Sequence, residues 1–565
     1  MDKMFERLSE ERKELQAKGY YPEWVTTQGH QMFKQSYKYE DTYMLGRHKT
    51  IAKELSQYLP TKELREHYEE VFFDLLWSGK LSPSTPVLAN CGTDRGFTVA
   101  CSGQYIGDSV DSFYTELRET ALLSQAGFGT SGHFSDIRPR GSSISKGGTA
   151  SGVRPVIDDF FTCASKISQG GARRGSFAAY LDIESDDFFE CIQDLFVNTN
   201  GKNYGWIIKQ SFIDKLVSGD TEANKRFTEA LYNKQIHGKG YYFFLDKVNE
   251  HRPQMYKDHG LDVKASNLCS EIMLHSSEEY TYSCILSSLN LTKWDDMEND
   301  NTIFDATVFL DCVTSDFIAK SKDVAGLEKV RAFTIKGRAI GLGVMGLHTL
   351  MQSRSLPIDS LQSHLLDMSI FKRIHDESLR ASEWLARVLG EPDWCKGYGV
   401  RNTHRTALAP TKSTALLMGG VSEGINPDPG MAFEMASAVG ELKRITPVFY
   451  ELMKERGMYN KKTVNRIIAN LGSVQQEDWL TDHEKQVFKT AFEINQEVLI
   501  NRTSARQQFI CQGQSLNLFV ADEDMDAQVA YLISLIFLDP NILSQYYIYS
   551  RNGVVVNDEC VMCSG

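Results

Sequence analysis

The chain has 565 residues, of which 42% are hydrophobic and 24% are charged, and this is the composition of an ordinary globular protein. Its formal net charge is −13 and no long basic run appears, which argues against an extended nucleic-acid-binding surface. The charged N-terminus has no apolar signal core, and the most apolar late run, residues 529–538, is too short to span a bilayer. Because the 11 cysteines are sparse and odd in number for a disulfide scaffold, we expect a reducing, cytoplasmic compartment.

The N-terminal part of the chain, residues 1–80, is predicted to be helical. Residues 6–18 form a charged segment with leucines at helical spacing, and residues 64–77 repeat that spacing before a glycine. The turn-rich run at residues 81–86 then predicts a boundary. From there to about residue 350, short apolar runs alternate with glycine-rich loops and amphipathic helices, which indicates an α/β fold.

Three segments have the composition of anion-binding loops. Glycine-rich loops at residues 138–143 and 168–175 carry arginines, a combination that suits phosphate contacts but also occurs in ordinary surface loops. Residues 410–414 are rich in hydroxyl groups and precede an apolar run, which predicts a helix N-cap, either a plain cap or an anion site. Residues 440–500 are predicted to form solvated helices.

The stretch Asn267-Leu268-Cys269-Ser270-Glu271 alternates three chemically useful side chains with two others. On an extended segment, side chains two residues apart point the same way, so an amide, a thiol and a carboxylate would share one face. Such a face can hold a hydroxyl group, take a proton from it and present sulfur to carbon. The alternative is a loop with a buried cysteine, and buried free cysteines are common.

A second glycine pattern matches the dinucleotide fingerprint GxGxxG at Gly341, Gly343 and Gly346. An acidic residue, Asp359, follows at a suitable distance, but residues 332–338 upstream make a poor buried strand. We therefore favour a packing role for these glycines over a dinucleotide-dependent dehydrogenase.

The C-terminal end combines aromatic and thiol groups. Tyr546 and Tyr547 lie side by side in an apolar stretch, and Cys560 and Cys563 form a CxxC pair two residues before the end of the chain. A CxxC pair suits either dithiol–disulfide exchange or zinc binding. Because no second CxxC pair exists, we favour a mobile redox pair over a zinc-binding interaction module.

Together and in this order, the motifs resemble those of the catalytic (large, α) subunit of class I ribonucleotide reductase. The resemblance runs from about Tyr21 to the last residue. The motifs that carry it are Ser84-Thr85-Pro86, Cys101 with Gly107-Asp108-Ser109, residues 168–171, residues 267–271, Cys284, residues 410–414, residues 505–509, Tyr546-Tyr547 and the terminal cysteine pair.

The resemblance implies a ten-stranded α/β barrel of two five-stranded halves, with a central finger loop that carries a radical cysteine. It implies a helical N-terminal region at residues 1–80, a catalytic barrel at 81–553 and a flexible redox tail at 554–565. The implied enzyme is a ribonucleoside-diphosphate reductase that makes 2′-deoxyribonucleotides and is regulated by deoxynucleoside triphosphates. Residues 1–20 are too few for the N-terminal ATP cone of many family members, so we expect that site to be missing.

The resemblance also implies a role for each residue at the catalytic centre. Cys269 would become the transient thiyl radical, Glu271 would act as general base, and Asn267 would hold the substrate hydroxyl groups. Cys101 and Cys284 would supply two electrons and become a disulfide.

Radical and electron supply are implied by the C-terminal motifs. Tyr546 and Tyr547 would relay a radical from a separate β subunit, expected to be a dimetal-carboxylate protein. Cys560 and Cys563 would swing into the barrel to reduce its disulfide, and thioredoxin or glutaredoxin would then reduce them. No cofactor is expected in this chain itself, and Cys511, which departs from the family pattern, is given no role.

Nucleotide contacts are implied at two sets of residues, and a homodimer is implied for the assembly. Substrate would be bound by Ser84, Thr85, Thr411, Lys412, Ser413 and Thr414. The effector would be bound by Asp108, Ser109 and Arg138, with Arg173 on the loop that links effector to substrate.

Overall fold

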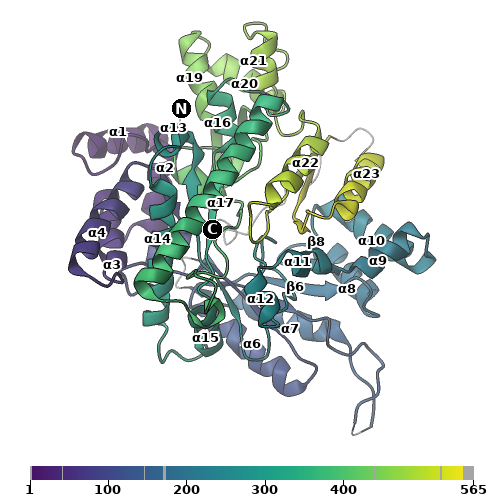
Figure 1. Ribbon diagram of the computed structural model, residues 1–565. Coiled ribbons are helices and arrows are strands. Elements are labelled where there is room, and N and C mark those ends of the chain that lie inside the picture. The colour runs from purple at the N-terminus through teal and green to yellow at the C-terminus, as the bar shows by residue number, and fades with distance from the viewer. Residues whose placement is uncertain are drawn as a thin grey trace.

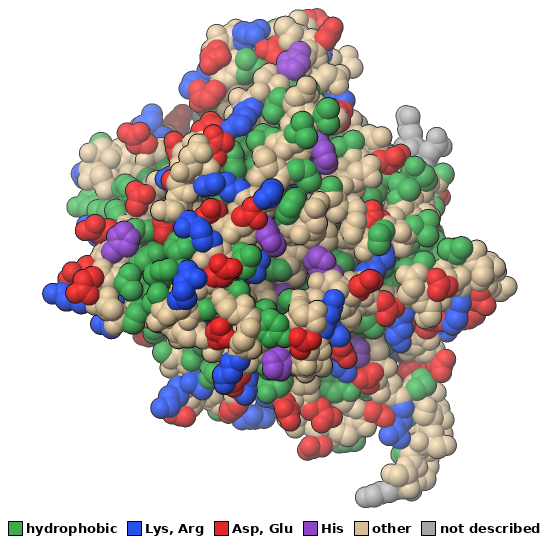
Figure 2. Space-filling model, in the orientation of Figure 1, with side chains coloured by type: hydrophobic (Ala, Val, Ile, Leu, Met, Phe, Trp, Pro, Cys, Tyr) green, Lys and Arg blue, Asp and Glu red, His purple; other side chains and the backbone are tan. Residues whose placement is uncertain are grey.

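The computed structural model describes residues 3–40, 42–145, 147–169, 173–437, 440–521 and 525–550. Figure 1 shows a central group of strands with helices packed around it, the N-terminal helices on one flank and a group of later helices at the top. On the face in Figure 2, acidic and basic side chains are interspersed. No helix within the described ranges is long and apolar enough to cross a membrane.

The N-terminal region is helical, as predicted. Its helices are α1 (Lys3–Ala17), α2 (Thr27–Met32), the π-helix η1 (Phe33–Tyr37), α3 (Met44–Ser56) and α4 (Lys62–Trp77). Thr61 caps α4 by accepting a hydrogen bond from the Leu64 amide, and Phe72 packs against Phe309 with ring centroids 5.2 Å apart. This region therefore shares a continuous apolar core with the rest of the chain.

Residues 81–86 do not form the turn-rich boundary that the sequence predicts. They form strand β1 (Leu81–Pro83), buried throughout, and the start of helix α5 (Thr85–Asn90). Pro86 is accepted because it lies in the first turn of α5, where its missing N–H costs no helical hydrogen bond. β1 pairs antiparallel with a barrel strand, so the segment belongs to the barrel wall.

Five parallel strands form the first half of the barrel. They are, in spatial order, β2 (Cys101–Tyr105), β3 (Gly129–His133), β6 (Phe177–Asp182), β7 (Asn203–Ile208) and β8 (Tyr241–Phe244). Parallel neighbours need crossover connections, and helices supply them here. These helices are α6 (Val110–Gln125), α7 (Val153–Lys166), α8 (Phe188–Val197), α9 (Gln210–Val217) and α10 (Thr221–His237).

The second half is also parallel but less regular. It begins with β9 (Tyr282–Cys284) and β10 (Leu286–Asn290), continues with β11 (Gly341–Met345), and reaches residues 406–408 and 514 through isolated bridges. Strands β14 (Leu518–Val520) and β16 (Ile548–Ser550) extend the parallel pairing. Its larger helices are α14 (Thr302–Lys320), α15 (Glu328–Gly337), α17 (Leu361–Leu389), α22 (Gln496–Gln507) and α23 (Met525–Leu538).

The two halves meet antiparallel at both edges. β2 pairs with β9, and β8 pairs with β15 (Ser544–Gln545). Apart from the antiparallel β1, the strands within each half pair in parallel, and the strands of the two halves pair antiparallel. The prediction of an α/β barrel built from two five-stranded halves is confirmed.

The chain between β8 and β9 enters the barrel interior. After α11 (Leu245–His251) and α12 (Gln254–Asp258), residues 259–281 contain no regular strand or helix, yet Leu268 and Ile272 are fully buried. They belong to a second apolar cluster that also contains the inward-facing Tyr180. This segment is the predicted finger loop.

The prediction for residues 440–500 is wrong at its start. A hairpin of β12 (Ala432–Ser437) and β13 (Gly440–Ile445) precedes the helices α19 (Pro447–Glu455), α20 (Lys461–Ala469) and α21 (Asp482–Val487). These helices are not simply solvated, because Phe449, Met453 and Ile467 form a small core of their own. Figure 1 shows this group at the top of the molecule.

Two glycines of the fingerprint, Gly341 and Gly343, lie inside strand β11, and Gly346 follows it as the N-cap of α16 (Leu347–Ser353) with φ 78°. A Cβ atom on Gly341 would lie 2.3 Å from Leu286 Cδ2, and one on Gly343 would lie 2.6 Å from the carbonyl oxygen of Ala407. The glycines are needed where neighbouring chain segments approach closely. Their predicted packing role is confirmed.

Candidate active site

The tip of the finger, residues 267–271, is a turn rather than the extended segment expected from the sequence. The Ser270 amide donates to the carbonyl of Asn267 over 3.3 Å, and Ser270 has a left-handed backbone with φ 61°. The side chains of Asn267, Cys269 and Glu271 therefore do not share one face of a strand. The turn instead brings the side chains of Asn267 and Glu271 into hydrogen-bond contact.

Asn267 organises the turn through its side-chain amide. Its Oδ1 accepts hydrogen bonds from the Glu271 amide (3.2 Å) and the Ile272 amide (3.3 Å), while its Nδ2 donates to Glu271 Oε1 over 3.0 Å. The same residue thus fixes the backbone of the finger and orients the carboxyl group. Asn267 and Glu271 are each 1% exposed, so these bonds form away from solvent.

Glu271 has the properties of a proton-transfer group. Burial raises the pKa of Glu271 to about 7, although hydrogen bonds from its own backbone, from Asn267 and from Ser515 lower it. A carboxyl group with a pKa near neutrality can accept a proton and return it during one catalytic cycle.

Residues distant in sequence hold the backbone of the finger tip. Ser515 donates to the carbonyl of Cys269 over 2.7 Å, Ser544 donates to that of Ser270 over 2.6 Å, and Tyr180 donates to that of Asn267 over 2.6 Å. An irregular segment inside a barrel has few backbone partners, so side chains must supply them. The sequence gives no signal for these three residues, because each lies on a separate strand or strand-like segment.

Cys101 and Cys284 lie directly opposite each other on β2 and β9. Opposed residues on antiparallel strands have Cα atoms about 4.5–5.5 Å apart, which is within the range that a disulfide needs. Burial raises the pKa of Cys284 well above its usual value, and the neighbouring Cys101, Glu271 and Cys269 add to this effect. Both thiols are free and buried in this structure.

A tyrosine pair leads to Cys269. The Tyr546 hydroxyl lies 3.8 Å from Cys269 Sγ, and the rings of Tyr546 and Tyr547 have centroids 4.0 Å apart. Tyr241 on β8, which the sequence did not single out, places its hydroxyl 3.0 Å from that of Tyr547. All three tyrosines are buried, so the aromatic groups form a compact cluster that ends at the thiol.

The residues predicted to bind substrate lie at two short helix starts. Thr411 precedes α18 (Lys412–Leu417) with φ 57°, and its hydroxyl accepts from the Gly424 amide instead of capping α18. Ser84 precedes α5 and likewise makes no side-chain cap, while Thr85 lies 3.2 Å from the Tyr37 hydroxyl. Both helices contact the segment formed by α2 and η1, which brings the two predicted sets to one region.

The residues predicted to bind the effector are partly engaged with each other. Arg138 Nε donates to Asp108 Oδ2 over 2.7 Å, and the Arg138 amide donates to Asp108 Oδ1 over 3.2 Å. Ser109 caps α6 by accepting from the Ser112 amide. Arg173 lies in strand β5 (Arg173–Arg174), which pairs with β4 (Ser168–Gln169), and its side chain lies outside the described residues.

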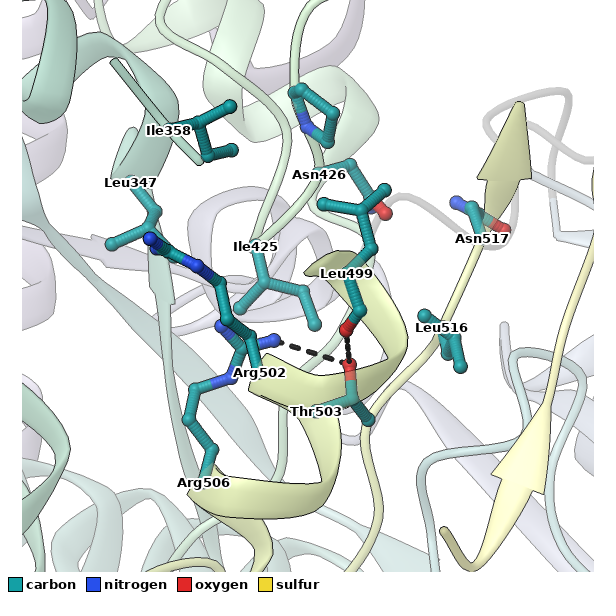
Figure 3. Close-up of a pocket in the computed structure, with 11 residues that line it drawn as sticks. Leu347, Ile358, Ile425, Asn426, Leu499, Arg502, Thr503, Arg506, Leu516 and Asn517 are labelled. Atoms are coloured by element: carbon teal, nitrogen blue, oxygen red, sulfur yellow. Dashed lines mark hydrogen bonds between the residues drawn. The ribbon is translucent and has the colours of Figure 1, made fainter. Parts of the chain in front are cut away.

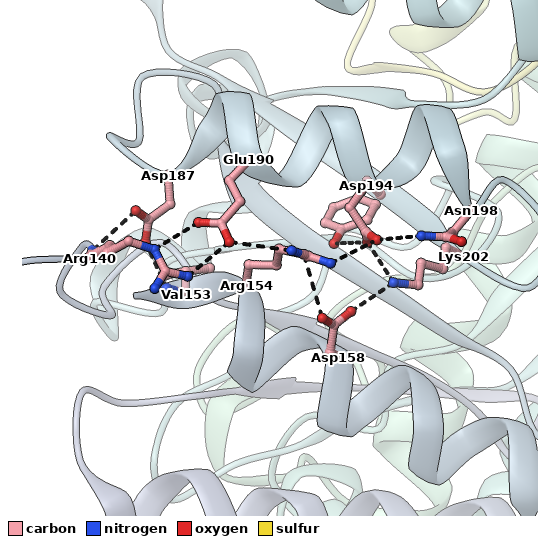
Figure 4. Close-up of polar contacts among 10 residues, drawn as sticks. Arg140, Val153, Arg154, Asp158, Asp187, Glu190, Asp194, Asn198 and Lys202 are labelled. Atoms are coloured by element: carbon pink, nitrogen blue, oxygen red, sulfur yellow. Dashed lines mark hydrogen bonds and ion pairs between the residues drawn. The ribbon is translucent and has the colours of Figure 1, made fainter. Parts of the chain in front are cut away.

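An ion-pair network anchors the loop that follows Arg138 (Figure 4). Asp187 accepts hydrogen bonds from the amides of Arg140 and Val153, at the two ends of the loop. Glu190 pairs with the guanidinium groups of Arg140 and Arg154. The base of the loop is therefore fixed to α7 and α8.

Two cavities in the described part of the chain are lined by residues other than those around Cys269. The one in Figure 3, beside Arg502 and Thr503 of α22, has a volume of about 10 Å³, which is room for about one water molecule. A wider pocket of about 450 Å³ lies at the base of the finger, lined by Tyr105, Lys264 and other residues. Cys560 and Cys563 lie outside the described residues, so the geometry of the predicted redox tail stays a prediction.

Comparison with known proteins agrees with this geometry. The model of the family described as ribonucleotide reductase, barrel domain, matches residues 99–221, 213–394 and 391–538. A protein of Frog virus 3 (isolate Goorha), named as a ribonucleoside-diphosphate reductase large subunit, is 31% identical over 518 residues, which cover 88% of this chain and 88% of that protein. A vitamin B12-dependent ribonucleoside-diphosphate reductase of Thermoplasma acidophilum is 30% identical and covers 80% of this chain and 61% of its own length.

A solved structure is similar over nearly the whole chain. The class Id ribonucleotide reductase α subunit of Actinobacillus ureae aligns with a TM-score of 0.85 and 35% identity, covering 94% of this chain and 98% of that one. The resemblance seen in the motifs is thus confirmed by sequence and by fold. The chain belongs to the ribonucleotide reductase family and is a large, catalytic subunit of the class I type, an oxidoreductase.

Proposed function

We propose that this chain reduces ribonucleoside diphosphates to 2′-deoxyribonucleotides, using a thiyl radical at Cys269 that a separate subunit initiates. The observation that carries the proposal is the continuous contact from Tyr547 through Tyr546 to Cys269. That path ends in a barrel interior where the turn also places Glu271, and where Cys101 and Cys284 oppose each other. These contacts support a reaction centre formed by Cys269, Glu271 and the Cys101–Cys284 pair.

The chemistry assigns a distinct task to each group. The Cys269 radical removes the 3′-hydrogen atom of the ribose, and Glu271 takes the 3′-hydroxyl proton, so that the 2′-hydroxyl group can leave as water. Asn267 keeps the carboxyl group and the hydroxyl groups in register. Cys101 and Cys284 supply two electrons and two protons as they form a disulfide, and Cys269 returns the hydrogen atom to C3′.

The tyrosine pair favours a separate radical subunit over a radical made in place. Sequence identity alone does not separate the two radical sources, because a vitamin B12-dependent relative is 30% identical to this chain. A radical made beside Cys269 would need no aromatic path, whereas here buried rings in contact lead from Tyr547 to the thiol. We infer a class I β subunit as partner.

The proposal also covers the binding of substrate phosphates and effector, the assembly and the reductant. Phosphates of the substrate would lie at the starts of α5 and α18, where Ser84, Thr85 and residues 411–414 gather. A deoxynucleoside triphosphate would bind at Asp108 and Arg138, which are held by the anchored loop. We also propose a homodimer, and reduction of the barrel disulfide by Cys560 and Cys563 with thioredoxin or glutaredoxin as final reductant.

The test is a reductase assay on the purified chain, with a ribonucleoside diphosphate and a dithiol, in the presence or absence of a candidate radical subunit. We expect deoxyribonucleotide only when the radical subunit is present. Activity with adenosylcobalamin and no radical subunit would contradict the class I assignment. Release of product without any radical source would contradict the mechanism as a whole.

A further inference from the structure

Lys234 on α10 is a fully buried lysine. Its exposed fraction is 0%, and no carboxylate in the described part of the chain forms an ion pair with it. Lysine is rarely buried to this extent unless it is paired, because its charge loses hydration. Burial accordingly lowers the pKa of Lys234 well below its usual value. Because desolvation of this amine is unfavourable, we expect a specific role for Lys234.

The contacts of Lys234 connect two segments of the tyrosine cluster. Its Nζ donates to the carbonyl of Gly240 over 2.7 Å and to the carbonyl of Tyr546 over 2.8 Å, and it lies 4.9 Å from the centroid of the Tyr242 ring. An ammonium group has three N–H donors, and two carbonyls and one aromatic face are suitable acceptors for them. Gly240 directly precedes Tyr241, so one side chain holds the backbone on both sides of the cluster.

We propose that Lys234 is a positioning residue for radical transfer: it fixes the backbone of Tyr546 against β8 and so holds the Tyr546 hydroxyl at its distance from Cys269. This inference rests on the proposed function. Transfer between a phenol and a thiol requires contact, and the observed separation of 3.8 Å leaves little room for displacement. A displacement of about 1 Å can slow a positioned reaction by about a hundredfold.

A positioning role and a purely structural role predict different outcomes for Lys234→Met. Methionine has a similar length and no charge, and replacing a buried charged group with an apolar one is often neutral or stabilising. If Lys234 only stabilised the fold, the folded variant would keep the kcat of the wild-type chain and only its thermal midpoint would change. If it positions Tyr546, kcat falls by about ten- to a hundredfold in a folded protein, with KM for the ribonucleotide unchanged.

Lys247 on α11 is a matched control. It is also buried, donates to the carbonyls of Phe537 (2.9 Å) and Asp539 (2.7 Å), and lies 4.0 Å from the centroid of the Phe244 ring. None of these contacts involves the tyrosine cluster. Lys247→Met should therefore leave kcat unchanged, whatever its effect on the thermal midpoint.

The experiment compares both variants with the wild-type chain in the presence of its radical subunit. Besides kcat and KM, the experiment records the radical of 3-aminotyrosine introduced at position 546. This radical accumulates because 3-aminotyrosine is easier to oxidise than tyrosine. The β-proton hyperfine splitting of that radical depends on the ring dihedral. We expect Lys234→Met to change the splitting and lower kcat, and Lys247→Met to change neither.

Unchanged kcat and splitting in folded Lys234→Met would overturn the inference. If the methionine variant does not fold, Lys234→Leu, which also lacks an N–H donor, replaces it under the same criteria. Wild-type chain that makes no deoxyribonucleotide would instead count against the proposed function. The two failures are therefore distinguishable.

Discussion

At the scale of single residues, the environment of Glu271 links catalysis to stability. The unshifted pKa of a glutamate is 4.5, and burial raises that of Glu271 to about 7. Between these two values the folded chain binds more protons at this residue than the unfolded chain does. The contribution of Glu271 to the free energy of unfolding therefore falls as pH rises from about 4.5 to about 7.

Glu271→Gln should consequently be inactive but not less stable. We expect kcat to fall by about a hundred- to ten-thousandfold, because the general base is lost, while Asn267 and Ser515 keep suitable partners. Relative to wild type, the variant should gain up to about 3 kcal/mol of stability between pH 4.5 and 7, and no more above that range.

Denaturant unfolding at several pH values, with parallel pH–rate profiles, checks both parts of this prediction. The wild-type profile should rise through about pH 7 as Glu271 ionises. An active Glu271→Gln, or a difference in stability that does not depend on pH, would contradict the assignment.

At the scale of secondary-structure elements, close packing between barrel strands decides where glycine is required. A Cβ on Gly343 of β11 would lie 2.6 Å from a backbone oxygen, whereas one on Gly46 of α3 would make only ordinary contacts at 3.5 Å. Gly343→Ala should cost about 1–3 kcal/mol, while Gly46→Ala should be neutral or stabilising. Thermal unfolding of the two variants tests the comparison, and equal midpoints would contradict a packing role for Gly343.

The ion pair between Arg138 and Asp108, at the start of the anchored loop, gives a second prediction at this scale. The side chains of Arg138 and Asp108 are 40% and 28% exposed, so their ion pair contributes at most about 1 kcal/mol to stability. If the proposed effector site is correct, Arg138→Ala should fold normally but lose the response of substrate preference to dATP, dTTP or dGTP. The measurement is the ratio of products formed from competing substrates. Wild-type ratios in the variant would show that the effector does not use Arg138.

The sequence singled out those candidate site residues that lie in short, recognisable motifs. The cysteines, Asn267, Glu271 and the tyrosine pair could be identified because their order along the chain resembles that of a known family. The turn at the finger tip could not, because the left-handed backbone of Ser270 is stabilised by distant side chains such as Ser515 and Ser544. Tyr241 and Lys234 were missed for the same reason.

At the scale of the whole molecule, the finger and the C-terminal strands meet inside the barrel. The finger enters between the two halves, and strand β15 closes the sheet one residue before Tyr546. The same closure that completes the barrel therefore places the tyrosine pair beside Cys269.

The most direct test of this account is the turnover of Tyr546→Phe with the radical subunit present. Phenylalanine keeps the ring but removes the hydroxyl that contacts Cys269, so the radical should not reach the thiol. Tyr204→Phe, at a buried tyrosine of β7 that bonds to Asp194, is the matched control and should retain turnover. We predict no deoxyribonucleotide from folded Tyr546→Phe; sustained turnover by that variant would contradict the account.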